Sequence, residues 1–225
     1  MERLKRFILG SQPGWKTAPT PPSGPGAGEA ADSSHERHSH GLEQFSSSLQ
    51  GEQGLYVLDL GGLTQANVTF ITELGHKLYS EAFLRLVEAA GLPQDTAEGQ
   101  SGAETEAFLN HALGFPEAHF DGVLIWDALE FLPRPVLKAT VDRLFRILKP
   151  GGYLLAFFHA DEKAATVPVY SYRISNADTL QLAHLEMRRP VQHFNSRTVE
   201  RLFQRFQSVK FFLARDNLRE VIVRR

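Results

Sequence analysis

The alternation of strand-like and helix-like segments is the feature that most constrains the fold of this chain. From about Leu42 to the end, short apolar runs alternate with longer segments in which apolar residues recur every three or four positions. Such alternation predicts parallel strands joined by crossover helices. The central strands are apolar on both faces, as expected when helices cover both sides of the sheet. We therefore expect one α/β domain over residues 42–225.

The apolar runs and periodicities define the elements of this domain. The predicted strands are residues 55–60, 77–80, 107–109, 120–127 and 153–158. The predicted helices are residues 66–74, 82–90, 137–148 and 197–206. Two further runs, 209–213 and 219–223, flank a polar turn, which is typical of an antiparallel hairpin. The prediction is a doubly wound, mostly parallel, Rossmann-like sheet with an antiparallel C-terminal strand.

The first 41 residues differ in composition from the rest of the chain. Residues 11–40 are dense in Pro, Gly, Ser and Ala, which bury too little surface to offset chain entropy, so residues 1–41 are predicted to be a disordered tail. His35, His38 and His40 could bind a transition metal, but without an ordered acidic partner they are expected to be solvated, and no metal site is predicted. The tail could instead engage a protein partner.

Charge and cysteine content exclude several classes of function. The 24 Lys and Arg residues are balanced by 26 Asp and Glu residues, so no global positive field favours nucleic acid as a partner. The absence of cysteine excludes disulfides, thiolate metal sites and thiol nucleophiles. Neither a membrane span nor a secretory signal is recognisable, so a cytoplasmic location is expected.

Polar residues and glycines cluster where the predicted strands end, which is the edge at which doubly wound sheets bind ligands. Asp59, Gly61 and Gly62 follow the first strand, where glycines permit left-handed dihedral angles and expose amides at a helix N-terminus. Glu81 follows the second strand, and Asn110 follows the third. These residues are candidates for ligand binding.

The fourth and fifth strands end in residues suited to acid–base chemistry. Trp126 and Asp127 close the fourth strand, and a buried carboxylate there requires a partner or a function. His159 ends the fifth strand and is a candidate general base, although a hydrogen-bonded structural role is the alternative. The segment 161–195, which contains Tyr170 and Tyr172, could cover a pocket or serve as a structural layer.

In their order, these motifs resemble those of the class I S-adenosylmethionine (SAM)-dependent methyltransferases. Residues 57–61, VLDLG, resemble the start of the first motif of that family. Residues 120–133, FDGVLIWDALEFLP, resemble its fourth strand and the following segment. Residues 144–152, LFRILKPGG, resemble the entry to its fifth strand, and the closing hairpin resembles its reversed last strand.

The resemblance implies SAM as cofactor and a small-molecule or lipid-like methyl acceptor. It implies that Glu81 binds the ribose hydroxyls and Asn110 the adenine edge. Trp126 would pack near the sulfonium by a cation–π contact or fill the core. Asp59 would contact the methionine amine or only fix the turn. For Glu81, the alternative is a favourable interaction with a helix dipole.

The sequence departs from the family at the glycine-rich turn, where Leu63 and Gln65 replace glycines. A non-glycine residue in a left-handed conformation costs roughly 1–2 kcal/mol, and a leucine also occupies ligand space. Either the turn takes another path or the cofactor binds poorly. A catalytically inactive regulator or scaffold for a protein partner is therefore the alternative function.

Overall fold

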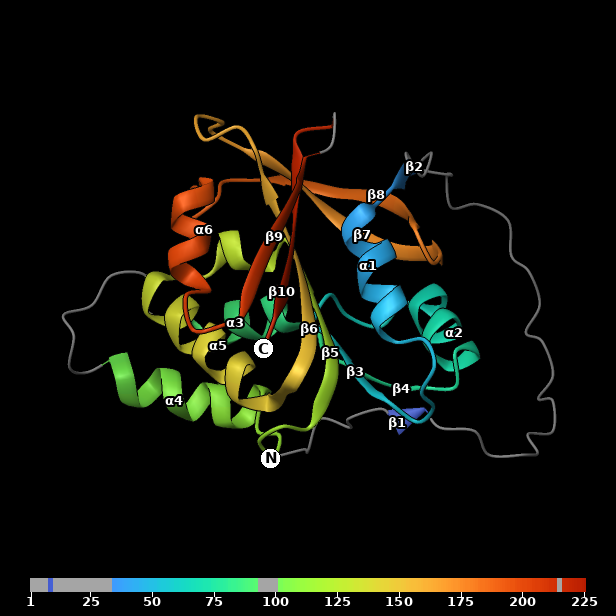
Figure 1. The fold of residues 1–225 in the computed structure, drawn as a ribbon. Coiled ribbons are helices and arrows are strands. Elements are labelled where there is room, and N and C mark those ends of the chain that lie inside the picture. The colour runs from blue at the N-terminus through green and yellow to red at the C-terminus, as the bar shows by residue number, and fades with distance from the viewer. Residues whose placement is uncertain (1–7, 10–33, 93–100, 214–215) are drawn as a thin grey trace, which may run out of the picture.

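The computed structural model describes residues 8–9, 34–92, 101–213 and 216–225, which form two sheets and their covering helices (Figure 1). The strands are β1 (Ile8–Leu9), β2 (Ser34–His38), β3 (Tyr56–Asp59), β4 (Lys77–Ser80), β5 (Phe120–Trp126), β6 (Leu148–His159), β7 (Val167–Asn176), β8 (Thr179–Arg188), β9 (Ser208–Leu213) and β10 (Leu218–Arg224). The helices are α1 (His40–Ser48), α2 (Gln65–Glu73), α3 (Phe83–Ala90), α4 (Ser101–Ala112), the 3-10 helix η1 (Ala128–Phe131), α5 (Arg134–Ile147) and α6 (Ser196–Leu202).

The larger sheet has seven strands in the order β1-β4-β3-β5-β6-β10-β9. Strand β3 pairs in parallel with β4 and β5, and β5 pairs in parallel with β6. Strand β10 runs antiparallel to both β6 and β9. The predicted doubly wound, mostly parallel sheet with an antiparallel C-terminal strand is confirmed.

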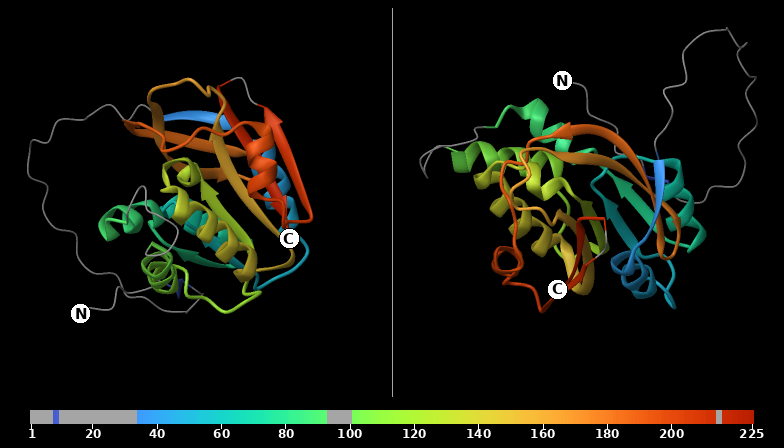
Figure 2. Two further views of the ribbon diagram at one scale, coloured as in Figure 1. Left: turned by 90° about the vertical axis from the view of Figure 1, so that its left-hand side faces the viewer. Right: turned by 90° about the horizontal axis from the view of Figure 1, so that it is seen from above.

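Two apolar layers flank this sheet. Helices α3 to α6 cover one face, while α1, α2 and a smaller sheet of order β2-β8-β7 cover the other (Figures 1 and 2). Along β6, Ala156 and Phe158 are buried in the first layer, and Leu155 and Phe157 in the second. Both faces of the central strands are therefore buried, which explains their uninterrupted apolar sequence.

The strand predicted at 107–109 is wrong, because these residues lie within α4. Thr105, Leu109, Ala112 and Leu113 are buried at spacings of four, three and one, which is the period of a helix. This face packs on α5, and the place beside β4 in the sheet is taken by β1. Residues 93–100, which precede α4, lie outside the described residues.

The folded part of the chain begins before the predicted boundary at residue 42. Residues 34–38 form β2, which pairs antiparallel with β8, and α1 begins at His40. Residues 1–7 and 10–33 of the predicted tail lie outside the described residues. None of the helices in the described part of the chain combines the length and apolar character that crossing a bilayer demands.

A buried ion-pair network explains why residues 34–41 are folded. Arg37 donates from Nη2 to Glu220 Oε1 over 2.9 Å, and its Nε is paired with Asp216. The second carboxylate oxygen of Glu220 accepts hydrogen bonds from the Ser39 hydroxyl, over 3.0 Å, and from the Gly41 amide. The network joins β2 and the start of α1 to the closing hairpin, about 180 residues further along the chain.

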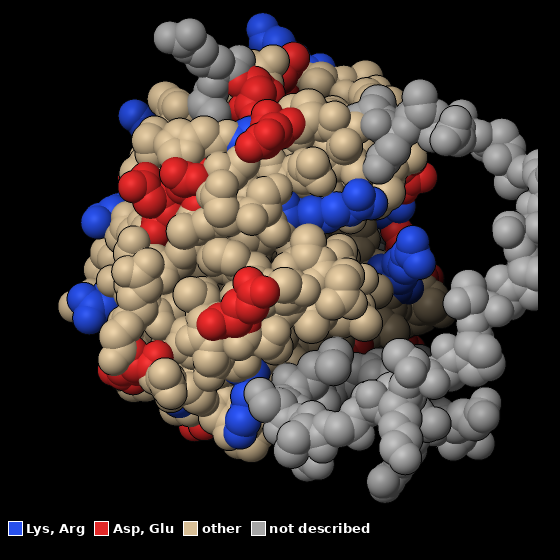
Figure 3. Space-filling view, turned by 90° about the vertical axis from the view of Figure 1, so that its right-hand side faces the viewer, with Lys and Arg blue, Asp and Glu red and all other residues tan. Residues whose placement is uncertain are grey.

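Charged side chains outside this network are distributed without a strong bias on the face that carries α1 and α2. Acidic and basic side chains of the described residues are interspersed over this face (Figure 3). This pattern agrees with the near balance of acidic and basic residues in the sequence.

The network makes a prediction about stability. Replacing Arg37 by Ala leaves the carboxylate of Glu220, which is 1% exposed, buried without its cation, so we expect a loss of about 3–5 kcal/mol in the free energy of unfolding. Asp142→Asn is the control, because it removes the exposed pair with Arg205 and should change stability by less than about 1 kcal/mol. Urea unfolding measures both. Equal stability of the two variants would contradict the assigned role of Arg37.

Candidate cofactor site

A cavity of about 580 Å³ lies at the carboxyl ends of β3, β4 and β5. Its wall combines the turn after β3, the first turns of α3, the end of β5 and the β7–β8 hairpin. The lining residues are Leu60–Thr64, Ala82, Leu84, Arg85, Glu88, Ile125–Ala128, Val169–Tyr172, Leu185, Glu186 and Arg188. This is the edge where the strand ends of an open α/β sheet bind ligands.

The turn after β3 avoids the strain expected at Leu63. The left-handed conformation falls on Gly62, with φ of 93°, and its amide donates to the Glu81 carbonyl over 3.1 Å. Leu63 has no positive φ and is 56% exposed at the cavity rim, while Thr64 caps α2. The turn thus takes another path, and Leu63 leaves the cavity open.

Gly61 is required for a different reason. A Cβ atom at this position would lie 2.5 Å from Cδ1 of Trp126, a distance that real side chains do not tolerate. The glycine therefore allows the indole to pack directly against the turn, and its own backbone is exposed on the cavity wall.

Asp59 is completely buried beneath this turn. Its Oδ1 accepts hydrogen bonds from the Gly61 amide, over 2.9 Å, and from the Trp126 indole N–H, over 2.7 Å. Its Oδ2 accepts from the Asn67 amide over 2.7 Å. Burial raises the pKa of Asp59, and these three donors oppose the rise. Asp59 is not among the residues that line the cavity, and its geometry is that of a group that fixes the turn.

Trp126 has an unusual backbone conformation at the end of β5. Its φ is 52°, and the pairing of β5 with β6 is irregular between Leu124 and Trp126. Such a conformation costs of order 1–3 kcal/mol and persists only where its surroundings enforce it. The ring stacks on Tyr172 with centroids 4.9 Å apart, and the side chain is 2% exposed. Trp126 therefore fills the core, although it also contributes to the cavity wall.

Two predicted ligand residues lie off the wall. Glu81 is half-buried at the end of β4 beside the cavity, and its backbone amide donates to the Asp59 carbonyl over 2.9 Å. Asn110 is exposed on α4, where its Oδ1 accepts from Arg143 over 2.8 Å. The wrong assignment of residues 107–109 to a strand is the reason that Asn110 was expected at the ligand edge.

Asp127 is a buried carboxyl on the cavity wall. It is 5% exposed, and Tyr172 donates its hydroxyl hydrogen to Oδ2 over 3.1 Å. Burial raises the pKa of Asp127 to about 7, with a contribution from the charge of Glu130 and opposition from His159. The group therefore exchanges a proton near neutral pH, which suits an acid or base.

His159 lies behind the wall, paired with a residue that sequence analysis missed. Its Nδ1 lies 2.6 Å from Oε2 of Glu130, and its backbone amide donates to the other oxygen over 3.0 Å. Burial alone lowers the pKa of His159, but the hydrogen bond and the negative charges of Glu130 and Asp127 outweigh it and raise the pKa. The only sequence signal for Glu130 is its position three residues after Asp127, in the turn that leaves β5.

The β7–β8 hairpin forms part of the cavity wall. The segment 161–195, expected to cover a pocket or to serve as a structural layer, contains β7 and β8, and β2 completes this smaller sheet. Arg188 on β8 pairs with Glu88 on α3 and with Glu186, so a charged link crosses one side of the cavity. Arg85 also lines the cavity and is exposed. No motif in the sequence indicates that Arg85 or Arg188 lies at the cavity.

The raised pKa of Asp127 predicts a specific pH dependence of stability. Between the unfolded pKa near 3.8 and the folded pKa near 7, the folded chain holds one proton more, so this group lowers stability as pH rises. Asp127→Asn keeps an acceptor for Tyr172 and removes this dependence. Between pH 4 and pH 8, the free energy of unfolding of the variant should rise relative to that of wild type by on the order of 4 kcal/mol.

Urea unfolding at pH 4, 6 and 8 measures this difference. Asp161→Asn is the control, because Asp161 is exposed and the same change there should leave the pH dependence unaltered. If the free energies of unfolding of wild type and Asp127→Asn changed with pH in parallel, the raised pKa of Asp127 would be contradicted.

Comparison with known proteins finds one family match within the chain. Residues 58–156 match the family model described as "Methyltransferase domain". No curated protein sequence matches the chain.

Several solved methyltransferase structures are similar to the chain at low sequence identity. One is the 1,6-didemethyltoxoflavin-N1-methyltransferase of Burkholderia thailandensis with bound S-adenosylhomocysteine, with 12% identity over 83% of this chain and 79% of that one, and a TM-score of 0.44. A SAM-dependent methyltransferase from Methanosarcina mazei has 20% identity over 77% of this chain and 93% of that one, with a TM-score of 0.43. Another, from Mesorhizobium loti, has 15% identity over 81% of this chain and 96% of that one, with a TM-score of 0.45. The residues that match the methyltransferase-domain family, 58–156, span β5, α5 and most of the parallel sheet.

Proposed function

We propose that this protein binds SAM in the cavity at the glycine turn and transfers its methyl group to a small-molecule or lipid-like acceptor. The observation that carries the proposal is the open cavity of about 580 Å³ at the carboxyl edge of the parallel sheet, in a chain whose residues 58–156 match the methyltransferase-domain family. Cavities that bind small molecules and cofactors usually measure about 300–1,000 Å³.

The residues at the turn fit such a cofactor. Gly61 and Gly62 present backbone without side chains on the wall, and Thr64, which also lines it, caps α2, so a helix N-terminus lies at the cavity. In the proposal these groups receive the methionine portion. Glu81, at the end of the neighbouring strand, binds the ribose hydroxyls.

The bound cofactor would supply an electrophilic methyl group on a sulfonium. The acceptor would receive this methyl group, and the electron pair of the carbon–sulfur bond would stay with sulfur. The main task of the chain is to hold the two reactants in line. The β7–β8 hairpin, which supplies Tyr170 and Tyr172 to the wall, limits access of water to the reacting atoms.

Asp127 is the residue that we propose to accept the acceptor's proton. Its carboxyl lies on the wall, and its pKa near 7 allows it to be ionised when the acceptor binds. His159, predicted as the general base, is instead proposed to act through its charge on Asp127 as a positioning residue, held by Glu130.

The character of the wall supports a partly apolar acceptor. Leu84, Val169 and Leu185 line the cavity, and Leu185 is 57% exposed. The charged residues of α3 and β8 that line the cavity are Arg85, Glu88, Glu186 and Arg188. We therefore propose an acceptor with an apolar body and a polar group.

Isothermal titration calorimetry with S-adenosylhomocysteine tests the proposal. We expect binding by wild type, and binding at least tenfold weaker, a loss of about 1.4 kcal/mol or more, for Glu81→Ala because the ribose hydroxyls lose their acceptor. Glu117→Ala is the matched control, since Glu117 is exposed and outside the cavity, and it should bind as wild type does. If the folded wild type gives no binding heat at millimolar ligand, the proposed activity is excluded.

A further inference from the structure

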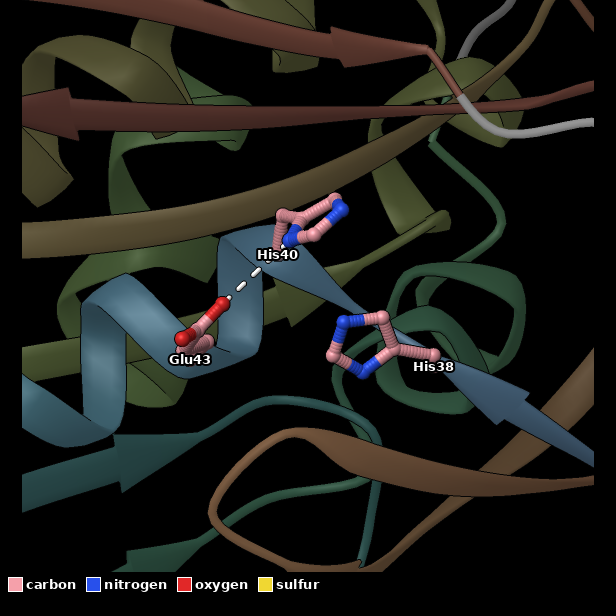
Figure 4. Close-up of side chains that lie close together, drawn as sticks. All are labelled: His38, His40 and Glu43. Carbon is pink, nitrogen blue, oxygen red and sulfur yellow. Dashed lines mark hydrogen bonds and ion pairs between the residues drawn. The ribbon is translucent and has the colours of Figure 1, made fainter.

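We infer that His38, His40 and Glu43 form a binding site for a divalent transition-metal ion of the zinc class. One ligand atom from each side chain lies within 4.8 Å of the others, at the junction of β2 and α1 (Figure 4). None of these residues lines the cavity, so the inference is independent of the proposed methyl transfer. The sequence analysis predicts no metal site because it expects this segment to be disordered and without an acidic partner, whereas the structure provides both order and Glu43.

His40 and Glu43 are already spaced as two ligands of one ion. The Nδ1 atom of His40 lies 3.2 Å from Oε2 of Glu43. Two ligands bonded to one metal at about 2.0–2.1 Å lie about 3–3.4 Å apart in tetrahedral or octahedral geometry. A metal ion can therefore take the place of the proton between these two atoms with little movement.

His38 has the ring orientation of a metal ligand. Its Nδ1 lies 3.0 Å from the carbonyl oxygen of Asp178, and because a carbonyl only accepts, Nδ1 carries the hydrogen. In the neutral ring, Nε2 then has a free lone pair, and Figure 4 shows that this other nitrogen faces His40 and Glu43. Metal-bound histidines are oriented in this way by a hydrogen bond from their second nitrogen to a carbonyl or carboxylate.

The backbone between the two histidines is held on both sides. The Ser39 amide donates to the Asp178 carbonyl over 2.7 Å, and the Ser39 hydroxyl accepts from the Leu42 amide and donates to Glu220. Closing the site therefore requires only side-chain rotation. The three side chains are 52–59% exposed, so an ion reaches them and water can complete its coordination.

The donor set indicates which ions fit. Two imidazoles and one carboxylate suit Zn²⁺, Ni²⁺, Co²⁺ or Cu²⁺, whereas Mg²⁺ and Ca²⁺ require mostly oxygen ligands. The N-terminus of α1 disfavours a cation, but the carboxylates of Glu43 and Asp178 offset that effect. A bound ion would tie β2 to α1 and so fasten the small sheet that forms one wall of the cavity.

Calorimetric titration of the full chain with ZnCl₂, after removal of metals with a chelator, tests the inference. We expect one high-affinity ion per chain at pH 7.5. His38→Ala/His40→Ala should bind at least tenfold more weakly. The matched control is His35→Ala/His184→Ala, which removes two exposed histidines outside the cluster and should bind as wild type does.

Two further measurements separate loss of the site from loss of structure. The free energy of unfolding in urea, measured without metal, should be equal for wild type and both double variants, because the removed rings are exposed. Glu43→Gln should weaken Zn²⁺ binding without changing that free energy. No Zn²⁺ uptake by wild type, or equal affinity of wild type and the His38/His40 variant, would overturn the inference.

Discussion

The carboxylate of Asp59 is the interaction on which the candidate site depends. It is fully buried, and each of its three hydrogen bonds comes from a different segment: the turn after β3, the end of β5 and the first turn of α2. Asn67 extends this set, because its amide also donates to the Tyr172 carbonyl and its oxygen accepts from the Ile174 amide. A buried carboxylate is tolerated only when its hydrogen bonds are made, so the four segments are held in one arrangement.

This arrangement explains the local irregularities around the cavity. The indole of Trp126, whose backbone is left-handed, donates to Asp59, and Gly61 provides the space that the ring needs. The stacked Tyr172 then presents its hydroxyl to Asp127, whose buried carboxyl remains on the wall. Asp59 and Asp127 thus differ in their surroundings, although each follows an apolar strand. Asp59 is a structural carboxylate beneath the turn, whereas Asp127 is an ionisable carboxyl on the wall.

The sequence predicts those features that depend on local pattern. The parallel strands, the helix after Pro133, the closing hairpin and the glycine turn all follow from periodicity or backbone requirements within a few residues. Features that depend on distant partners are not predictable in this way. The order of residues 34–41 requires Arg37 to meet Glu220, and the environment of His159 requires Glu130 from another strand end. The short apolar run at 107–109 is ambiguous by itself, and only packing on α5 decides that it is helical.

A crystal structure of the protein with S-adenosylhomocysteine would test the central claim most directly. The account predicts that the adenosyl group lies against Gly61 and Gly62, with a ribose hydroxyl within hydrogen-bonding distance of the Glu81 carboxylate and the sulfur facing Asp127. A complex in which the ligand binds elsewhere, or in which Leu63 turns inward and fills the cavity, would contradict it.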